Sequence, residues 1–324
     1  LPILNRVLTA ASQPVHIDGQ VLHVSASLGV TFYPQGEAVD ADQLMRQADQ
    51  AMYEAKLSGK NRYQIFDTEQ HRHARNTHES IEDIRRALLS GELELYYQPK
   101  VNMRTGIVLG AEALLRWQHP ERGLIPPAVF LPVIENHVLA IELGEWVIET
   151  ALKQVEAWRR QGMDLSVSVN VGARQLQHPD FVARVQEMLT AHPALTPEDL
   201  EIEILETSAL KDLASVSRVI KACQEFGIRF ALDDFGTGYS SLAYLKRLPV
   251  SQIKIDQDFV RDMLGDPDDL SILDGIITLT KAFHRQVIAE GVETVEHGTI
   301  LLQLRCELAH GYGIATAMPG NRFV

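Results

Sequence analysis

From residue 92 onward, short apolar runs alternate with longer stretches that carry apolar residues at helical spacing. The stretches predict helices, most clearly at 137–160, 209–226 and 268–284. The short runs predict eight strands, at 93–98, 110–117, 165–171, 200–205, 229–234, 251–256, 286–290 and 308–313. Alternation of strands with helices favours a parallel sheet in an α/β fold. Eight strands in about 230 residues favour a closed (β/α)8 barrel. An open doubly wound sheet is the alternative, but no Gly-rich phosphate loop follows the first strand.

The first 91 residues follow a different pattern. Residues 67–91 are polar and helix-prone, which predicts a linker helix that docks on a barrel domain at 92–324. Residues 1–66 form a small α+β unit that is too small and too open for a complete domain, and we interpret it as the end of one. Its predicted elements are an amphipathic start, a hairpin of 15–17 with 21–30 that turns at Asp18-Gly19, a helix at 41–58 and a strand at 63–66.

The most informative strand end lies at 229–238. An apolar run stops at two adjacent carboxylates, Asp233 and Asp234, and a glycine-bracketed turn follows them. Adjacent residues of a regular strand point to opposite faces, so both carboxylates can reach one ligand only where the strand geometry loosens. Two unpaired carboxylates this close repel each other, which raises the pKa of one of them. We therefore expect a metal ion, a lysine or an arginine beside them.

Polar groups also mark the other predicted strand ends, where a (β/α)8 barrel carries its catalytic residues. Any single one of them is more often a salt-bridge partner. Together they are Glu112 and Arg116, Asn170, Glu201 with Glu203 and Glu206, Lys254 and Asp256, Glu290, and His310. Burying so many acids in one place is costly unless cations compensate. Oxygen ligands of this kind suit Mg²⁺ or Mn²⁺ rather than zinc. The lysine fits a group that orients or deprotonates a water, with its pKa lowered by the cations.

Composition narrows the classes of partner and location. The net charge of −13 argues against binding a nucleic-acid polymer, and an anionic ligand would need positive charge imported as metal ions. No apolar run approaches the roughly 20 residues that span a bilayer, and the N-terminus does not resemble a signal peptide. Cys223 and Cys306 form no spacing motif and suit a reducing compartment. We therefore expect a cytoplasmic location and no membrane contact from this segment, with the parent protein free to carry an anchor upstream.

Two stretches of the first unit resemble a known family. They are Ser25-Ala26-Ser27-Leu28-Gly29-Val30 and the segment from Ala48 to Arg62, and they resemble the C-terminal part of a GGDEF (diguanylate cyclase-type) domain. The family's Gly-Gly-(Asp/Glu)-Glu-Phe motif and its metal-binding half are not in the chain. We therefore expect no cyclase activity from this chain.

A second and stronger resemblance covers nearly all of 80–324. Glu112-Ala113-Leu114-Leu115-Arg116 resembles the motif of the EAL family of cyclic di-GMP phosphodiesterases. The resemblance continues in order through Tyr97-Gln98-Pro99, Asn170-Val171, Glu203-Ile204-Leu205-Glu206, the segment from Asp233 to Leu242, Lys254-Ile255-Asp256, Glu290-Gly291-Val292-Glu293 and Gly311-Tyr312. Several of these motifs are too long to match by chance.

This resemblance implies a modified, TIM-like (β/α)8 barrel whose first strand is antiparallel to the others. It implies Mg²⁺- or Mn²⁺-dependent hydrolysis of cyclic di-GMP, a bacterial second messenger, to linear pGpG with two metal ions.

It also implies roles for individual residues. Glu112, Asn170, Glu203 and Asp233 would bind the first metal ion, and Asp233 with Asp234 the second. Lys254 would hold or deprotonate the attacking water, Glu290 would support the metal and water shell, and Glu206 would steady the loop after Asp234. Gln98 and Arg116 would hold the dinucleotide, with Asp256 and His310 in the same substrate-binding set. Barrels of this family often pair, which allows a homodimer with 239–245 near its interface.

Several positions depart from the family's commonest pattern. Leu205 replaces a Thr and Gly172 a Ser, and we expect small effects from both. His310 stands where Gln usually precedes Gly-Tyr, close to the catalytic water, and this change puts turnover most in doubt. The stretch 315–319 lacks the usual Lys or Arg before Met-Pro. Because the chain then stops, we expect the last barrel helix to be incomplete, with some loss of stability.

Two other functions stay open. A catalytically inactive receptor for cyclic di-GMP would signal through the linker helix, but such a protein typically lacks metal ligands that this chain retains. A different enzyme on the same barrel, such as an enolase-type proton abstractor that uses Lys254 and Mg²⁺, is compatible with the fold alone.

Overall fold

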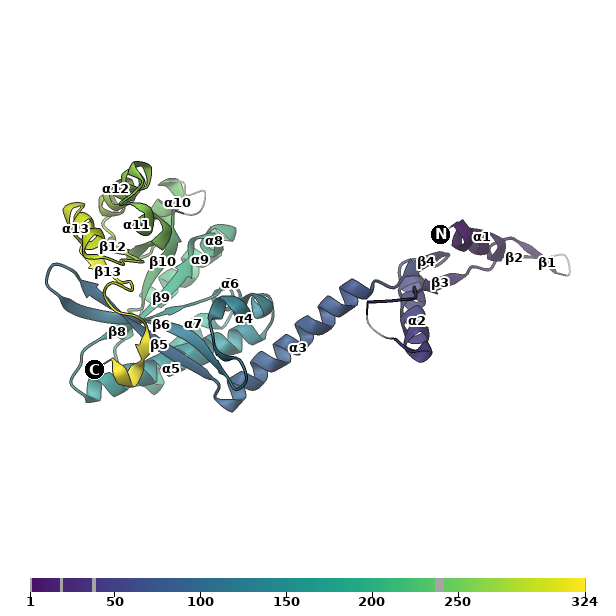
Figure 1. Ribbon diagram of the computed structural model, residues 1–324, viewed down its shortest axis with the longest axis horizontal. Coiled ribbons are helices and arrows are strands. Elements are labelled where there is room, and N and C mark those ends of the chain that lie inside the picture. The colour runs from purple at the N-terminus through teal and green to yellow at the C-terminus, as the bar shows by residue number, and fades with distance from the viewer. Residues whose placement is uncertain (1, 18–19, 37–38, 237–241, 324) are drawn as a thin grey trace. The chain divides into compact units, whose positions relative to one another are not determined.

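The computed structural model describes residues 2–17, 20–36, 39–236 and 242–323, without the side chains of 17, 69–76, 211 and 242–244 (Figure 1). The chain divides into two compact units, Leu1–Glu79 and Ser80–Val324. The division falls within one helix, α3 (Thr68–Ser90), which agrees with the helix predicted at 67–91. In the second unit, Ile84 and Ala87 of α3 are buried in the hydrophobic core.

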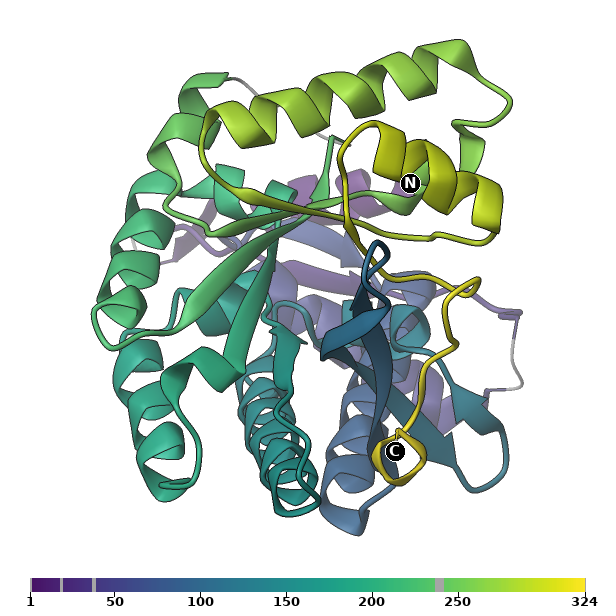
Figure 2. The same ribbon diagram turned by 90° about the vertical axis from the view of Figure 1, so that its left-hand side faces the viewer.

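The second unit is built on a closed barrel of eight strands (Figure 2). In chain order they are β5 (Leu93–Asn102), β6 (Ile107–His119), β8 (Ser166–Asn170), β9 (Leu200–Leu205), β10 (Arg229–Phe235), β11 (Gln252–Ile255), β12 (Gln286–Ala289) and β13 (Leu308–Ala309). Strand β5 pairs antiparallel with both β6 and β13, whereas the pairs from β6 to β13 are parallel. The predicted barrel with an antiparallel first strand is therefore confirmed.

Helices surround this barrel, as Figure 2 shows. They are α4 (Pro127–Ile134), α5 (Leu139–Arg160), α6 (Ala173–Leu176), α7 (Phe181–Ala191), α8 (Glu206–Lys211), α9 (Leu213–Gln224), α10 (Leu242–Arg247), α11 (Gln257–Asp262), α12 (Pro267–Ala282) and α13 (Val295–Gln303), with a 3-10 turn, η1 (Pro197–Asp199). Each long helix turns its apolar stripe inward, as Leu139, Ile148, Leu152 and Trp158 of α5 do. This outer layer seals the barrel wall and leaves the strand ends for chemistry.

Three predicted boundaries are wrong in ways that affect the site. The helix expected at 209–226 is two helices, because the chain breaks at Asp212, whose side chain accepts a hydrogen bond from Ser215 N and so caps α9. The strand expected at 308–313 ends at Ala309, since Gly311 brings the chain against the backbone of Val292. Strand β6 extends beyond both expected ends, because it pairs along its length with β5 and then with β7 (Gly123–Ile125).

The last described residues cross back to β5. Strand β14 (Met318–Pro319) pairs antiparallel with Tyr97 and Tyr96, and the 3-10 helix η2 (Gly320–Arg322) follows. Trp158 Nε1 donates a 3.1 Å hydrogen bond to Gly320 O and its ring lies 4.8 Å from that of Phe323. Between β13 and residue 323 the structure describes no α-helix, and the expected loss of stability stays a prediction.

The first unit contains α1 (Pro2–Ala11), β1 (Val15–Ile17), β2 (Gln20–Leu22), β3 (Ser27–Val30), α2 (Ala41–Leu57) and β4 (Arg62–Ile65). The single strand expected at 21–30 is wrong. Strand β2 pairs with β1, but β3 leaves that hairpin and pairs in parallel with β4, with α2 as the crossover. Gly29 allows this packing, because a Cβ there would lie 1.8 Å from Ala48 O of α2. The predicted turn at Asp18-Gly19 lies outside the described residues.

Candidate metal centre

At one end of the barrel, four carboxylates surround the ammonium group of Lys254, which is 1% exposed. Lys254 Nζ lies 2.6 Å from Glu203 Oε2, 2.7 Å from Glu290 Oε1, 3.1 Å from Asp233 Oδ2 and 3.3 Å from Glu112 Oε2. Glu203 lies on β9, Asp233 on β10 and Glu112 on β6, and Glu290 directly follows β12. The parallel strands all end at this face, which is why residues far apart in the chain meet here.

The sequence pattern indicated that Glu112 lies at a strand end, and the structure shows that it does not. It lies in the middle of β6, where it pairs in register with Gln98 of β5 and Ser168 of β8. Strand β6 runs on past the rim because its C-terminal part pairs with β5 and β7. The barrel rim therefore passes through the centre of β6, and Glu112 still joins the cluster.

The adjacent carboxylates of β10 both reach the cluster. Asp234 has φ +53°, and the pairing of β10 with β11 is irregular between Leu232 and Phe235. A left-handed residue breaks the alternation of a strand, and Asp tolerates that conformation better than most residues. The carboxylate oxygens of Asp233, Asp234 and Glu290 lie within 4.8 Å of one another as a result.

Burial and mutual repulsion set the charge states of these acids. Burial, followed by repulsion from neighbouring acids, raises the pKa of Asp233 well above its ordinary value and that of Asp234 to about 6. Burial and the charge of Glu203 also raise the pKa of Glu112. For Glu203 and Glu290, burial is outweighed, chiefly by Lys254, so the pKa of each is lowered.

The lowering of the Lys254 pKa that was expected from metal ions stays a prediction, whereas the neighbouring acids themselves act in the opposite direction. Burial favours the neutral amine, but Asp233, Glu112, Glu203 and Glu290 outweigh burial and raise the pKa of Lys254 well above its ordinary value. In this arrangement the ammonium group is the cation that balances the acids.

Asn170 and Glu203 extend the cluster toward β8 and the barrel interior. Asn170 Nδ2 donates a 2.9 Å hydrogen bond to Glu112 Oε1, which leaves Asn170 Oδ1 for another partner. Within the part of the chain that the structure describes, no donor makes a hydrogen bond to the buried Glu203 Oε1, and the ammonium of Lys100 lies 4.0 Å away. A buried carboxylate oxygen without a hydrogen bond is costly, so this atom is suited to a cation.

His310 reaches the same acids from β13, the strand next to β12. Its Nε2 lies 3.2 Å from Glu290 Oε1 and 3.5 Å from Glu112 Oε2. The residue directly follows β13 and is buried. The structure therefore places His310 in the acid cluster itself.

Glu206 and Asp256 hold backbone groups at the rim. Glu206 Oε2 accepts a 3.0 Å hydrogen bond from Gly236 N, two residues after Asp234. Asp256 caps α11 by accepting from Asp258 N at 2.8 Å, and it also contributes to the raised pKa of Asp234. The loop at 237–241, and with it part of the stretch 239–245 expected near a dimer interface, lies outside the described residues.

The two residues expected to hold a dinucleotide have other contacts. Gln98 is buried, and its Nε2 donates a 3.0 Å hydrogen bond to Ala315 O. Arg116 donates to Leu115 O at 2.8 Å, and its guanidinium lies 5.7 Å from the centre of the Tyr96 ring. Their role toward a ligand stays a prediction.

The residues present fit divalent metal ions. Four carboxylates meet the ammonium of Lys254 and that of Asp234 lies beside them, so negative charge is in excess, and one buried oxygen of Glu203 accepts no hydrogen bond from the described residues. Three sets of donor atoms lie within 4.8 Å of one another: Glu112, Glu203 and Asp233; Asp233, Asp234 and Glu290; and Glu112, Glu290 and His310. Asp233 belongs to two of the sets, as do Glu112 and Glu290, so each of these acids lies within reach of more than one candidate position for an ion.

Sequence reasoning missed a polar layer below the cluster. Lys100 of β5 donates a 2.6 Å hydrogen bond to Glu201, and Gln252 donates to both oxygens of Glu201 at 3.1 Å when its amide nitrogen faces that acid. Gln98 and Lys100 are two apart on β5, so they lie on the same face. That spacing was the available signal, because a buried Gln there places the following Lys inside the barrel.

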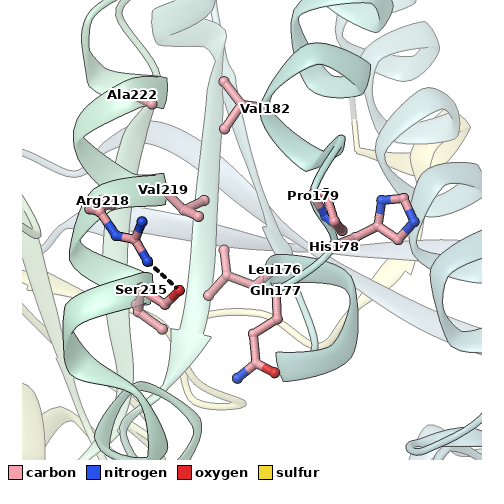
Figure 3. A pocket seen from close by; sticks show the side chains of 10 residues that line it. Leu176, Gln177, His178, Pro179, Val182, Ser215, Arg218, Val219 and Ala222 are labelled. Carbon is pink, nitrogen blue, oxygen red and sulfur yellow. Dashed lines mark hydrogen bonds between the residues drawn. The ribbon is translucent and has the colours of Figure 1, made fainter.

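A hollow of about 240 Å³ lies elsewhere on the barrel unit, beside α6, the start of α7 and α9 (Figure 3). Arg218 donates a 3.1 Å hydrogen bond to Ser215 there, and Leu176, Val182 and Val219 supply an apolar wall. It is lined by none of the residues of the acid cluster, so it has no part in the site described above.

Among the helices that the structure describes, none has the length and apolar character needed to cross a bilayer. Two family profiles match the chain. The profile described as "EAL domain" matches residues 81–317, and that described as "Diguanylate cyclase, GGDEF domain" matches residues 1–62.

Curated relatives and solved structures agree with these profiles. The chain is 37% identical over 323 residues to "Bifunctional diguanylate cyclase/cyclic di-GMP phosphodiesterase MucR" of Pseudomonas aeruginosa, covering 99% of this chain and 47% of that protein. It is 36% identical over 320 residues to "Cyclic di-GMP phosphodiesterase PdeR" of Escherichia coli, covering 98% and 48%. The structure "PaMucR Phosphodiesterase, c-di-GMP complex" matches with a TM-score of 0.73 and 38% identity, over 76% of this chain and 100% of that one. The chain spans about half the length of the curated relatives it matches.

Proposed function

The chain belongs to the EAL domain family, and we propose that its barrel is a metal-dependent phosphodiesterase that hydrolyses cyclic di-GMP to linear pGpG. The observation that carries the proposal is the convergence of Glu112, Glu203, Asp233 and Glu290 on Lys254, with Asp234 beside them. The names of MucR and PdeR support the choice of substrate.

We assign Glu112, Asn170, Glu203 and Asp233 to one Mg²⁺ or Mn²⁺ ion, and Asp233 with Asp234 to a second. Two bound ions would stabilise the negative charge that develops on the phosphate and make an attacking water more acidic. In the reaction, water attacks phosphorus, one ring P–O bond breaks, and the released ribose oxygen takes a proton. The linear product carries the new phosphate oxygen at one end.

The chain's own residues supply the remaining functions. Lys254 is held as a cation by its acids, so it is suited to orient the attacking water and to balance charge on the phosphate. Glu290 positions Lys254 through the 2.7 Å contact between them. Glu206 fixes the backbone at Gly236, where the loop after Asp234 begins. Gln98, Arg116 and Asp256 are assigned to binding the dinucleotide.

A receptor without activity is the second candidate. The presence of all five carboxylates and Asn170 favours the enzyme, because a receptor has no need for a group that activates water.

The proposals for the whole protein are more limited. They are a cytoplasmic location, cyclic di-GMP as the ligand, a homodimer through the barrel, and a division into a partial GGDEF-type unit at 1–66, a linker at 67–91 and the barrel at 92–324. An enolase-type reaction has no support among the matched families.

Conversion of cyclic di-GMP to pGpG, followed by chromatography, tests the proposal. The chain is assayed with Mn²⁺ or Mg²⁺, with EDTA, and as the Glu112→Ala variant. We expect turnover that requires metal and falls at least about 100-fold in the variant, because one ligand of an essential ion is lost. Tight binding of cyclic di-GMP without turnover would favour the receptor. If a folded chain neither binds nor hydrolyses cyclic di-GMP, both functions are overturned.

A further inference from the structure

We propose that His310 is a nitrogen ligand of the metal centre, together with Glu112 and Glu290, and that it shifts the centre's preference from Mg²⁺ toward Mn²⁺ and the later divalent transition metals. The inference rests on the metal centre of the proposed function, and it does not depend on the identity of the substrate. Neither the family profiles nor the relatives assign this role.

The distances around His310 match those between ligands of one ion. Its Nε2 lies 3.2 Å from Glu290 Oε1 and 3.5 Å from Glu112 Oε2, and the three donor atoms lie within 4.8 Å of one another. Neighbouring donor atoms of a six-coordinate ion with ligands at about 2.1 Å lie about 3 Å apart. The three side chains can therefore share an ion without a change in the backbone once the ammonium of Lys254, which lies 2.7 Å from the same oxygen of Glu290, moves aside.

The backbone holds the imidazole in place before any ion binds. His310 N donates a 3.0 Å hydrogen bond to Ala289 O, and His310 O accepts one of 3.2 Å from Val292 N. These bonds connect the histidine to the residues on either side of Glu290. Gly311 makes the close approach possible, since a Cβ there would lie 2.2 Å from Val292 N. A ligand that is already in position loses little entropy when it binds.

The simpler role for His310 is to donate a hydrogen bond to Glu290. The same oxygen of Glu290 already has the ammonium of Lys254 at 2.7 Å, and Glu112 Oε2 has it at 3.3 Å. Both oxygens are therefore paired with a cation without help from His310. What the imidazole adds is a nitrogen donor with a lone pair, which no other side chain of the three donor sets offers.

The nitrogen donor has a consequence for metal choice. Mg²⁺ strongly prefers oxygen ligands, whereas imidazole is a good ligand for transition metals, whose affinity rises from Mn²⁺ through Fe²⁺ and Co²⁺. A glutamine at this position offers an amide oxygen instead. Replacing His310 by Gln should therefore weaken Mn²⁺ binding and leave Mg²⁺ binding nearly unchanged.

The test uses Mn²⁺ alone, without nucleotide, on the full chain. Electron spin-echo envelope modulation of bound Mn²⁺ detects the nitrogen of a coordinated imidazole, and calorimetry gives the Mn²⁺ and Mg²⁺ affinities. We expect imidazole modulation in the wild-type chain and its loss in His310→Gln. We also expect Mn²⁺ affinity to fall about tenfold or more, which is the scale of losing a supporting metal contact. Mg²⁺ affinity should change by less than about twofold.

His284→Asn is the matched control. His284 is an exposed histidine with φ +56°, a conformation that asparagine tolerates, so this variant removes an imidazole outside the centre. It should keep both the modulation and the affinities. If His310→Gln lowers the melting temperature, His310→Ala with added imidazole provides a second measurement, since external imidazole should restore the modulation.

Absence of imidazole modulation in the wild-type chain would overturn the proposal, as would modulation that persists in His310→Gln. Equal losses of Mn²⁺ and Mg²⁺ affinity would assign His310 a structural role instead. Hydrolysis of cyclic di-GMP is measured separately. Turnover without imidazole modulation overturns this inference alone, whereas imidazole modulation without turnover supports it and counts against the proposed enzyme.

Discussion

Asp233 and Asp234 are neighbours on β10, and both bring a carboxylate within 4.8 Å of that of Glu290. In a regular strand their side chains would point to opposite faces. The left-handed backbone of Asp234, at φ +53°, removes this alternation where the pairing of β10 with β11 becomes irregular. Strain of this kind is expected at functional sites and persists only where the surroundings enforce it.

This arrangement predicts that Asp234→Asn stabilises the metal-free chain at neutral pH. The folded chain holds the pKa of Asp234 at about 6, above its ordinary value of 3.8. Between these values the folded state binds more protons than the unfolded state, so the free energy of unfolding falls as pH rises through that window. Asparagine removes this contribution and tolerates the same φ. In EDTA, the melting temperature of the variant relative to wild type should rise from pH 4 to pH 6.5 and level off above it.

Adding Mn²⁺ should reverse the order. Only the wild-type chain offers the carboxylate of Asp234 to the second ion. Its melting temperature should therefore rise more than that of Asp234→Asn at pH 7. A difference between the two chains that stays constant with pH in EDTA would contradict the assigned charge state of Asp234. Equal gains with Mn²⁺ would remove Asp234 from the metal site.

Lys254→Met is predicted to destabilise the metal-free chain and to make metal more stabilising. The substitution leaves four carboxylates, three of them buried, without their ammonium group. Removing one partner of a buried ion pair costs about 3–5 kcal/mol, and divalent ions would then replace the missing charge. Urea unfolding in EDTA and in Mn²⁺ measures both effects. Hydrolysis should fall by about 100-fold or more, because the cation that orients the attacking water and balances charge on the phosphate is lost.

Lys153→Met is the control for this variant. Lys153 pairs with Glu149 one turn away on the exposed face of α5, and such pairs contribute about 0.5 kcal/mol or less. Its stability should match that of the wild type in both conditions. If Lys254→Met is as stable as Lys153→Met in EDTA, the acids must be protonated rather than held by the lysine.

The sequence was sufficient to predict the barrel and most of the acid cluster. Parallel strands end at one face, so the motifs that follow them had to converge, and Glu203, Asp233, Lys254 and Glu290 do so. What the sequence did not predict were the ends of individual helices and strands. The break at Asp212 depends on a single cap competing with a continuous helical pattern, and the short β13 depends on close packing at Gly311. Such contacts between distant segments leave no periodic pattern.

The position of Glu112 and the polar layer at Lys100 show a second limit. Periodicity identifies which face of a strand a residue occupies, but it does not give the height of the barrel rim along that strand. Glu112 lies mid-strand because β6 continues into pairing with β7. Lys100 lay beyond the strand expected at 93–98, and its role depends on Glu201 reaching it across the barrel interior.

Glu206 predicts a graded effect on hydrolysis. Its Oε2 accepts the hydrogen bond from Gly236 N at 3.0 Å. Glutamine keeps an oxygen acceptor at this place, whereas alanine leaves the N–H without it, at a cost of about 1–3 kcal/mol. If this cost falls on the active arrangement of the strand end, Glu206→Ala should lower kcat about 10- to 100-fold and Glu206→Gln by less. Rates at saturating Mn²⁺, with melting temperatures for both variants, test this; equal rates for the two would exclude the hydrogen bond as the cause.

The last prediction separates the polar layer from the metal centre. Lys100 Nζ lies 2.6 Å from Glu201 and 4.0 Å from Glu203, and both acids are buried. Lys100→Met should therefore lower the free energy of unfolding by about 3–5 kcal/mol, as Lys254→Met does. The two variants should differ in their response to Mn²⁺. Glu201 belongs to none of the donor sets of the metal centre, so an ion bound there cannot replace the charge of Lys100. The double variant Lys100→Met/Glu201→Gln removes both charges and should recover most of the stability in EDTA. If Mn²⁺ restores the free energy of unfolding of Lys100→Met as fully as that of Lys254→Met, the two lysines serve one site. Lys100 then belongs to the groups that balance the charge of the metal ligands.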